Sequence, residues 1–213
     1  MRKYFFLLSA IGSLLLLGSC NGLFEDLYDN PVATVSDGYG FVRIDNANKC
    51  GTIYIDVTSY KRWTYVNLRD KTTDTSNIIL GQEAPAKWDF AMHRYDVKTN
   101  GGAAFETSCA NIDELRKGIP EGATFTPDTL SRVVIDMSHM MDGYLDYDTS
   151  YVNPVLSRWL YVDLSSMPPI YTLSLKPYLL RLSDGSYAAL FFDNFMDESS
   201  VKGFVTIKYI YSL

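Results

Sequence analysis

Apolar and polar positions alternate with a period of two along much of the chain, which is the pattern of half-buried β-strands. Residues 51–58 alternate between small or polar side chains and the apolar Ile53, Ile55 and Val57. After a brief turn, residues 63–68 form a second apolar and aromatic run. The short separation between the two runs predicts a β-hairpin.

A longer run at residues 88–99 predicts a central strand that carries an unusual string of polar groups into a turn. Successive side chains of a strand point to opposite faces. One face is expected to hold Trp88, Phe90, Met92 and Arg94, and the other Asp89, Ala91, His93 and Tyr95. We interpret His93 as a hydrogen-bonded strand residue rather than a ligand, and Met92 as a core residue.

Further strands are predicted in the second half of the chain. Residues 158–164 and 203–211 are rich in aromatic and β-branched side chains, which favour strands. Residues 177–182 and 187–192 flank the dipeptide Asp184-Gly185. Because such a dipeptide supports the positive φ of a tight turn, these two segments predict a hairpin.

Helical signals are scarce. Residues 111–118 combine a capping asparagine, early acidic residues, late basic residues and a final glycine, which together predict one short helix. A second helical turn is expected after Asp128. The sheet-rich, turn-punctuated pattern therefore predicts a single all-β domain of mainly antiparallel sheets with a few short helices.

The first twenty residues have the layout of an export signal. Two basic residues precede an apolar run at residues 4–17, and Gly18-Ser19-Cys20 follows. The run is too short to span a membrane as a helix. It ends in small residues before a cysteine, so we predict a lipoprotein signal peptide at residues 1–19 and lipidation of Cys20. An uncleaved anchor and an ordinary signal peptide are the alternatives.

This assignment divides the chain into three parts. Residues 1–19 are the signal peptide, residues 20–36 a lipidated tether, and residues 37–213 the β domain. The acyl chains are expected to hold the domain at the outer membrane, on its periplasmic face or at the cell surface.

The charge of the exported chain is strongly negative. The whole chain holds 19 Lys and Arg, so the loss of Arg2 and Lys3 leaves 17 against 25 Asp and Glu, a formal net charge of −8. An acidic surface repels phosphate backbones, which excludes nucleic acid as an expected partner. Cys50 and Cys109 have no zinc-ligand spacing, and we favour two half-buried thiols over a disulfide.

The sequence lacks the motifs of common enzyme classes. It has two histidines, His93 and His139, and no nucleophile elbow, His-Glu-x-x-His motif or phosphate-binding loop. The aspartates between positions 136 and 148 could form an acid and base pair for glycoside cleavage. Their spacing does not distinguish them from a solvated loop, so a binding protein is favoured over an enzyme.

A methionine-rich segment provides the clearest candidate ligands. Met137, His139, Met140 and Met141 place three thioethers and one imidazole within five residues, and both groups bind haem iron. In an extended segment Met137, His139 and Met141 share a face, whereas in a helix His139 points away from the methionines. Methionines that fill a core are the alternative.

Four tyrosines near this segment could wall a flat macrocycle, although tyrosines at sheet edges need no ligand. They are Tyr144, Tyr147, Tyr151 and Tyr161.

Three segments together resemble the HmuY-like proteins, the haem-binding surface lipoproteins of Bacteroidetes. They are WDFAMHRYDVKTNGG at residues 88–102, DMSHMM at residues 136–141 and KGFVTIKY at residues 202–209. The resemblance extends over residues 51–213. It implies an all-β fold with a few short helices, haem or a related tetrapyrrole as ligand, and delivery of that ligand to a TonB-dependent outer-membrane receptor.

The resemblance also implies two axial ligands to haem iron, both His or both Met, one after the Gly101-Gly102 turn and one near the Met-rich segment. Residues 103–108 contain neither Met nor His, so only the second ligand maps onto this chain. Met137, His139, Met140 and Met141 are therefore predicted to contact the cofactor, with Met140 and Met141 as candidate iron ligands. The alternative is a relative without iron coordination that serves as a ligand- or protein-binding scaffold lipoprotein.

Overall fold

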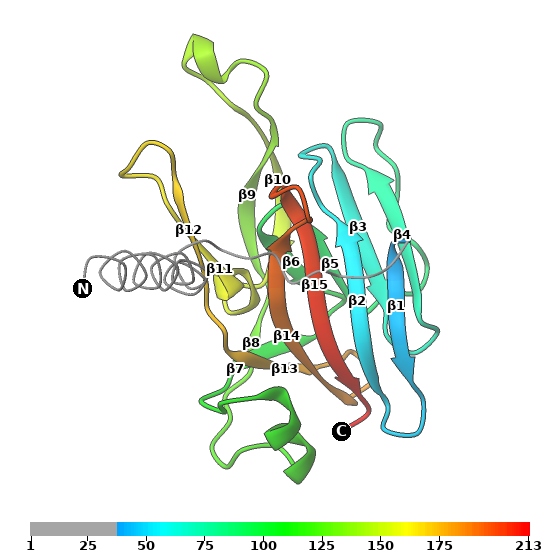
Figure 1. Cartoon of the computed structure of the whole chain (residues 1–213). Coiled ribbons are helices and arrows are strands. Elements are labelled where there is room, and N and C mark those ends of the chain that lie inside the picture. Colours follow the sequence, from blue (N-terminus) through cyan, green and yellow to red (C-terminus); the bar gives the residue numbers. More distant parts are fainter. Residues whose placement is uncertain (1–37) are drawn as a thin grey trace, which may run out of the picture. The chain divides into compact units, whose positions relative to one another are not determined.

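The computed structural model describes residues 38–213 of the chain. The predicted signal peptide and tether, including Cys20, lie outside the described residues. Within them the strand pairings are antiparallel and form two larger sheets and two separate hairpins (Figure 1). The prediction of an all-β fold is confirmed. Across residues 38–213, no helix is long and apolar enough to cross a membrane.

The seven-stranded sheet has the order β1-β2-β15-β14-β13-β7-β8 and the four-stranded sheet the order β4-β3-β5-β6. The strands of the first are β1 (Gly40–Asp45), β2 (Cys50–Asp56), β7 (Ala103–Glu106), β8 (Thr126–Pro127), β13 (Pro177–Arg181), β14 (Tyr187–Met196) and β15 (Lys202–Tyr211). Those of the second are β3 (Arg62–Asn67), β4 (Thr72–Asn77), β5 (Phe90–His93) and β6 (Asp96–Thr99).

The remaining elements are two hairpins and short 3₁₀ helices. The hairpins pair β9 (Thr129–Asp136) with β10 (Asp146–Val152), and β11 (Leu160–Asp163) with β12 (Ile170–Leu173). The 3₁₀ helices are η1 (Ile112–Lys117), η2 (Met140–Asp142) and η3 (Leu156–Trp159).

The main hydrophobic core lies between the two larger sheets. Alternating residues of β2 and β15 point into it, as do Phe90 and Met92 of β5, which are fully buried. Trp159 of η3 stacks on Phe192 with ring centroids 4.7 Å apart, and its Nε1 donates to the Tyr95 carbonyl at 3.0 Å. Burial of each such large side chain stabilises the fold by about 1.5–3 kcal/mol.

Part of each sheet's outer face is covered by another element. Val133 of β9 packs with Trp63 on the outer face of the four-stranded sheet. Leu115 of η1 packs on the outer face of the seven-stranded sheet, in a cluster that includes the half-buried thiols Cys50 and Cys109. The two sheets therefore lie in the middle of a layered arrangement.

The prediction of one long strand at residues 88–99 is wrong. The chain reverses at Arg94, whose φ is +52°, and His93 of β5 pairs with Asp96 of β6. Arg94 is held in this costly conformation because its guanidinium donates to the Thr58 carbonyl at 2.9 Å and to the Tyr95 hydroxyl at 3.0 Å.

This reversal also changes which faces the side chains occupy. Tyr95 packs against the main core, whereas Trp88 joins the cluster on the outer face of the four-stranded sheet. Within β5 itself, the predicted alternation holds, since Phe90 and Met92 face the main core and Ala91 the outer cluster.

The predicted hairpin between residues 51–58 and 63–68 is also wrong. Both runs form strands, but β2 pairs with β1 and β15, whereas β3 pairs with β4 and β5. The connection at residues 57–61 crosses from one sheet to the other, and the Val57 amide donates to the Gly203 carbonyl at 2.8 Å. Two strands that face one core across a sandwich have the same alternating pattern as two strands of a hairpin.

Several other sequence predictions are confirmed. β13 and β14 pair across the Asp184-Gly185 turn, where Gly185 has a φ of +83°, and β15 covers the last predicted strand. Asn111 caps η1 by accepting a hydrogen bond from the Glu114 amide at 3.2 Å, although this helix is 3₁₀ rather than α.

Two predicted segments differ from the structure. The strand predicted at residues 158–164 is divided: residues 158–159 end η3, and residues 160–163 form β11. The residues directly after Asp128 form no helical turn, because β9 begins at Thr129. Instead of capping a helix, the Asp128 carboxylate accepts hydrogen bonds from the amide and the hydroxyl of Thr99 at 2.7 and 2.9 Å.

Asn153 joins several of these elements at one buried point. Its side chain is 0% exposed, and its amide nitrogen donates to the Thr126 carbonyl and to Asp128, both at 2.9 Å. Its side-chain oxygen accepts from the amides of Val155 and Leu156 at 3.1 and 3.0 Å. The backbone of Asn153 makes two further hydrogen bonds. Its amide donates to the Val97 carbonyl of β6 at 2.7 Å, and the Ser157 amide of η3 donates to the Asn153 carbonyl at 3.0 Å.

We predict that Asn153→Ala lowers the free energy of unfolding by about 3 kcal/mol, because it leaves several buried donors and acceptors without partners. Urea denaturation would measure the loss. Asn46→Ala, at an exposed turn position, is the matched control and is expected to change stability by less than about 0.5 kcal/mol. Equal stability of the two variants would contradict a structural role for Asn153.

Candidate ligand-binding site

The predicted ligand residues lie at the end of the β9–β10 hairpin. Figure 1 shows this hairpin and the β11–β12 hairpin projecting beyond the two larger sheets toward the same end of the domain. The base of β9–β10 is anchored through Val133 and Val152, which pack in the outer cluster of the four-stranded sheet. Its far end carries η2, in which no residue is buried. A tip of this kind is supported by its strands and presents its side chains to solvent.

The Met-rich segment forms this tip. Met140 is 51% exposed and Met141 is 90% exposed, so neither fills the core. The Met140 amide donates to the Met137 carbonyl at 3.0 Å, which places these two residues one 3₁₀ turn apart and on the same side of the chain. The local conformation is thus closer to the helical alternative than to the extended one.

His139 lies beside the methionines and is restrained by two neighbours. Its ring stacks on Tyr144 with centroids 4.7 Å apart and planes 12° apart. Its Nδ1 lies 3.4 Å from an Asp142 carboxylate oxygen. These contacts fix the ring at the tip, where it is available to a ligand together with the thioethers.

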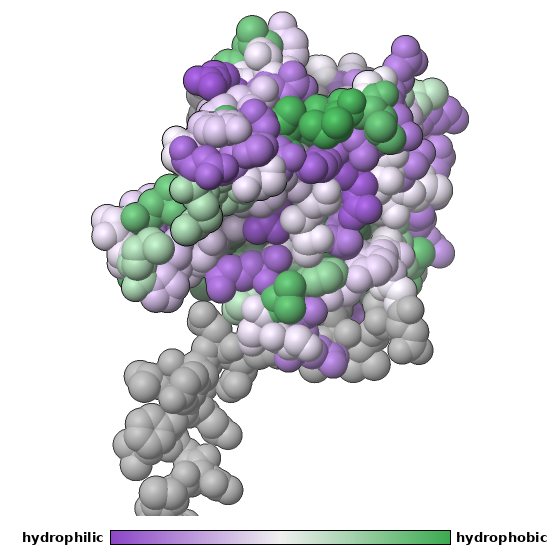
Figure 2. Space-filling model, turned by 90° about the horizontal axis from the view of Figure 1, so that it is seen from above, coloured by the Kyte–Doolittle hydropathy of each residue, from purple (hydrophilic) through white to green (hydrophobic). Residues whose placement is uncertain are grey.

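A further methionine lies at the end of the other projecting hairpin. Met167, in the loop between β11 and β12, is 90% exposed. The sequence pattern does not mark Met167 as a ligand, although its place between two serines and two prolines is typical of an exposed turn. Figure 2 looks onto the end of the molecule toward which both hairpins project and shows green apolar patches separated by hydrophilic surface.

The region after Gly101-Gly102, where the resemblance implies a first axial ligand, is not an open loop. Residues 103–106 form β7, and Ala103 and Ala104 are buried. A side chain from this strand would have to leave the sheet to reach a cofactor. Met167 instead provides a second exposed soft donor, in a different hairpin.

The four tyrosines considered as walls do not form one surface. Tyr144 stacks on His139. The Arg132 guanidinium carbon lies 4.1 Å from the ring centroid of Tyr147. Tyr151 lies at the base of β10 and lines a separate cavity, and Tyr161 is exposed on β11.

Two of the aspartates considered as an acid and base pair, Asp136 and Asp142, have other partners. Asp136 accepts an ion pair from Lys61 at 2.7 Å, and this contact lowers the pKa of Asp136 to about 2. Asp142 is the neighbour of His139. Among residues 38–213, no group of three or more His, Cys, Asp and Glu side chains is arranged to hold a metal ion.

His93 is part of the fold rather than of the tip. It is 1% exposed, and its Nε2 lies 2.6 Å from the Tyr60 carbonyl. Because a carbonyl oxygen only accepts, Nε2 carries the proton and donates. The ring also packs on Trp63 with centroids 5.1 Å apart. The interpretation of His93 as a hydrogen-bonded strand residue is confirmed.

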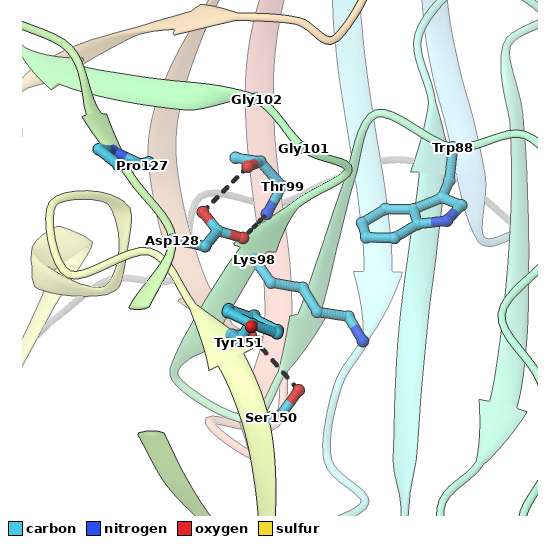
Figure 3. Close-up of a pocket in the computed structure, with 9 residues that line it drawn as sticks. All are labelled: Trp88, Lys98, Thr99, Gly101, Gly102, Pro127, Asp128, Ser150 and Tyr151. Carbon is cyan, nitrogen blue, oxygen red and sulfur yellow. Dashed lines mark hydrogen bonds between the residues drawn. The ribbon is translucent and has the colours of Figure 1, made fainter. Parts of the chain in front are cut away.

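A cavity of about 430 Å³ lies away from the tip, between β6, the β8–β9 junction and the base of β10 (Figure 3). It is lined by Trp88, Lys98, Thr99, Gly101, Gly102, Pro127, Asp128, Ser150 and Tyr151. Figure 3 shows the Lys98 side chain extending between Trp88 and the base of β10.

Aromatic rings surround the ammonium group of Lys98. Its Nζ lies 4.0 Å from the ring centroid of Trp63, 5.1 Å from that of Tyr65 and 5.5 Å from that of Trp88. Burial lowers the pKa of Lys98 to about 8, a shift that Asp128 and Asp148 only partly offset. This group is not visible in the sequence, because the rings come from β3 and from the residues before β5 and only the fold brings them to Lys98.

Comparisons with known proteins identify the family of the chain and agree with its all-β fold. The family model for the HmuY protein matches residues 59–209. The chain belongs to the HmuY family. A search of curated proteins finds no match.

Three solved structures are similar to the chain in both fold and sequence. A candidate HmuY-like haem-binding protein of Bacteroides vulgatus is 48% identical, with a TM-score of 0.78 over 83% of this chain and 99% of its own. A candidate lipoprotein of Bacteroides fragilis is 42% identical, with a TM-score of 0.77 over 82% and 96%. The apo form of the HmuY analogue of Tannerella forsythia is 27% identical, with a TM-score of 0.67 over 79% and 100%.

The buried position of His93 leads to a prediction. His93→Ala leaves the Tyr60 carbonyl without its donor, so the free energy of unfolding should fall by on the order of 1–3 kcal/mol. The affinity of the folded variant for a tetrapyrrole should stay nearly unchanged. Urea denaturation and a haem titration would measure the two quantities.

The exposed His139→Ala is the matched control for stability and should stay within about 0.5 kcal/mol of the parent protein. A His93→Ala variant of normal stability that had lost tetrapyrrole binding would instead make His93 a ligand.

Proposed function

We propose that this protein is a cell-envelope lipoprotein that binds haem or a related tetrapyrrole and passes it to an outer-membrane uptake receptor. The observation that carries the proposal is the exposure of methionines at the ends of two projecting hairpins. Met141 and Met167 are each 90% exposed. Methionine is more often used to fill apolar cores, so two exposed methionines at the ends of two projecting hairpins favour a ligand-binding role.

The donor chemistry of the tips fits haem. Thioether and imidazole groups are axial ligands of haem iron, and Met140, Met141 and His139 present them at the β9–β10 tip. The apolar methionine side chains also suit the flat, apolar face of a porphyrin. Bound haem would supply an iron that accepts soft or imidazole donors, and Met140, Met141 and His139 would provide those donors together with apolar contacts.

Family membership supports the same ligand. The relative from Bacteroides vulgatus is described as a candidate haem-binding protein, and the one from Bacteroides fragilis as a candidate lipoprotein. The HmuY family is a family of binding proteins rather than of enzymes. Capture and transfer of an unmodified ligand to a TonB-dependent receptor is the role that the family resemblance implies. The predicted lipoprotein signal at residues 1–19, before Cys20, is consistent with it.

A haem titration of the purified protein tests the proposal. Haem should shift the Soret band, and the reduced complex should be the tighter one, because thioethers are soft ligands that prefer ferrous iron. Replacing Met137, Met140 and Met141 together by Leu removes the sulfurs and keeps the apolar volume. We expect this triple variant, and Met167→Leu separately, to bind reduced haem at least about tenfold more weakly, a change of about 1.4 kcal/mol.

Leu130→Ala is the control, since Leu130 is 64% exposed on the same hairpin but offers no donor. Its haem affinity should match that of the parent protein. The absence of a Soret shift in both oxidation states would exclude haem coordination. It would favour the alternative of a family member that serves as a scaffold for another apolar ligand or for a protein partner.

The lipid anchor is tested separately. Cys20→Ala removes the lipidated thiol, so the protein should move from the membrane to the soluble fraction, because several acyl chains at about 0.8 kcal/mol per buried methylene provide the anchoring. Cell fractionation and the mass of the exported chain would measure this. Cys50→Ala, a change within the β domain, should stay with the membrane. A Cys20→Ala protein that remained membrane-bound with an uncleaved signal would show the anchor assignment to be wrong.

A further inference from the structure

The cavity beside Lys98 is not part of the hairpin tips. Ser150 and Tyr151, which line it, pair with Ser131 and Leu130 at the base of β9. Five residue steps separate Ser131 from Asp136 at the far end of β9, a length of about 16 Å at 3.3 Å per residue, and η2 lies beyond that end. A ligand in this cavity would therefore be distinct from one held by the methionines.

We infer that this cavity is a second ligand site, which takes a small planar aromatic carboxylate between Trp88 and Tyr151 with its acid group at Lys98. The two ring-bearing side chains stand on different elements, Trp88 before β5 and Tyr151 on β10 (Figure 3). Aromatic groups of this kind favour stacking with another ring. A volume of about 430 Å³ is sufficient for a ligand of one or two rings.

The polar groups of the cavity fix the charge of the ligand. Both oxygens of Asp128 are used within the protein, since they accept from the amide and hydroxyl of Thr99 and from Asn153 at 2.7–2.9 Å. Lys98 makes one long hydrogen bond, to the Tyr65 hydroxyl at 3.4 Å. In residues 38–213 no carboxylate lies within ion-pair distance of its ammonium group.

Lys98 is therefore a desolvated cation with unused donors. A ligand carboxylate would add a charge-assisted hydrogen bond, and burial of the ion pair away from water would strengthen it. A cationic ligand would be repelled by the Lys98 ammonium group. It would also find the aromatic cage of Trp63, Tyr65 and Trp88 already occupied by Lys98. The cavity thus selects against positive charge.

The floor of the cavity leaves room for the ligand. Gly101 has a φ of +68°, and an added Cβ there would meet nothing within 4 Å. At Gly102 an added Cβ would lie 2.5 Å from the Arg181 carbonyl, so this glycine is required for close packing of the backbone. Gly101 needs glycine for its backbone conformation and exposes its backbone to the open space.

Three probes of the same shape and different charge test the inference: 2-naphthoate, 2-naphthalenemethanol and 2-naphthylmethylammonium. Calorimetric titration of the purified mature protein should show 2-naphthoate binding at least tenfold more tightly than the alcohol, and no binding of the ammonium. Lys98→Met keeps an apolar stem without the charge and should weaken 2-naphthoate at least tenfold. Lys117→Met, at an exposed lysine of η1, should leave the affinity unchanged.

The pH dependence gives a second readout. Lys98 faces Asp128, Asp148 and Tyr65, and its pKa of about 8 means that its charge is lost as the pH rises through 8. The affinity for 2-naphthoate should therefore fall above pH 8 in the parent protein and show no such step in Lys98→Met. Thermal unfolding would establish that Lys98→Met is folded, as expected for removal of a charge that burial disfavours.

Equal binding of 2-naphthoate by Lys98→Met, tighter binding of the alcohol or the ammonium, or no binding at millimolar 2-naphthoate would each overturn the inference. The triple methionine variant separates this site from the proposed haem site. It should bind 2-naphthoate as the parent protein does, whatever its affinity for haem. Tyr151→Ala should weaken 2-naphthoate severalfold and leave the haem titration unchanged.

Discussion

The buried amide of Asn153 is the interaction on which the arrangement of the domain depends. It is placed where β10 ends and η3 begins, and its hydrogen bonds reach β6 and the segment that leads into β9. Both projecting hairpins start from this region, since β9–β10 enters it and β11 leaves it through η3. In a low-dielectric interior, a fully satisfied network of this kind fixes one geometry, because any other leaves polar groups unpaired.

The same network connects the fold to the cavity beside Lys98. Asp128 is bonded to Asn153 and to Thr99, the residue that follows Lys98 in β6. The hydrogen bonds of Asp128 therefore stay within the fold, and the ammonium group of Lys98 contacts aromatic rings instead of a carboxylate. Because Asp128 is used to hold the fold together, it does not neutralise Lys98, and within residues 38–213 the cavity beside it keeps an unpaired positive charge among aromatic rings.

The sequence predicts local structure well where the controlling interactions are local. The β13–β14 hairpin and the cap of η1 depend on Gly185 and Asn111, which are within a few residues of what they control. Arg94 is different, because its left-handed conformation is maintained by Thr58, which is 36 residues away in sequence. The assignment of β2 and β3 to different sheets is a tertiary property that alternation alone does not encode. The candidate site divides in the same way: the methionine cluster is visible in the sequence, whereas Met167 and the cage around Lys98 emerge only when distant segments meet.

The absence of buried residues in η2 has a consequence for how the protein meets a ligand. Amide protons in this tip are expected to exchange with solvent through local openings of low free energy, while those of β14 and β15 require unfolding of the whole domain. The tip can therefore rearrange without disturbing the core. Ordering these residues when a ligand binds costs conformational entropy, and this cost lowers the affinity. A weaker complex also releases its ligand faster, which is consistent with the proposed role in ligand capture and transfer.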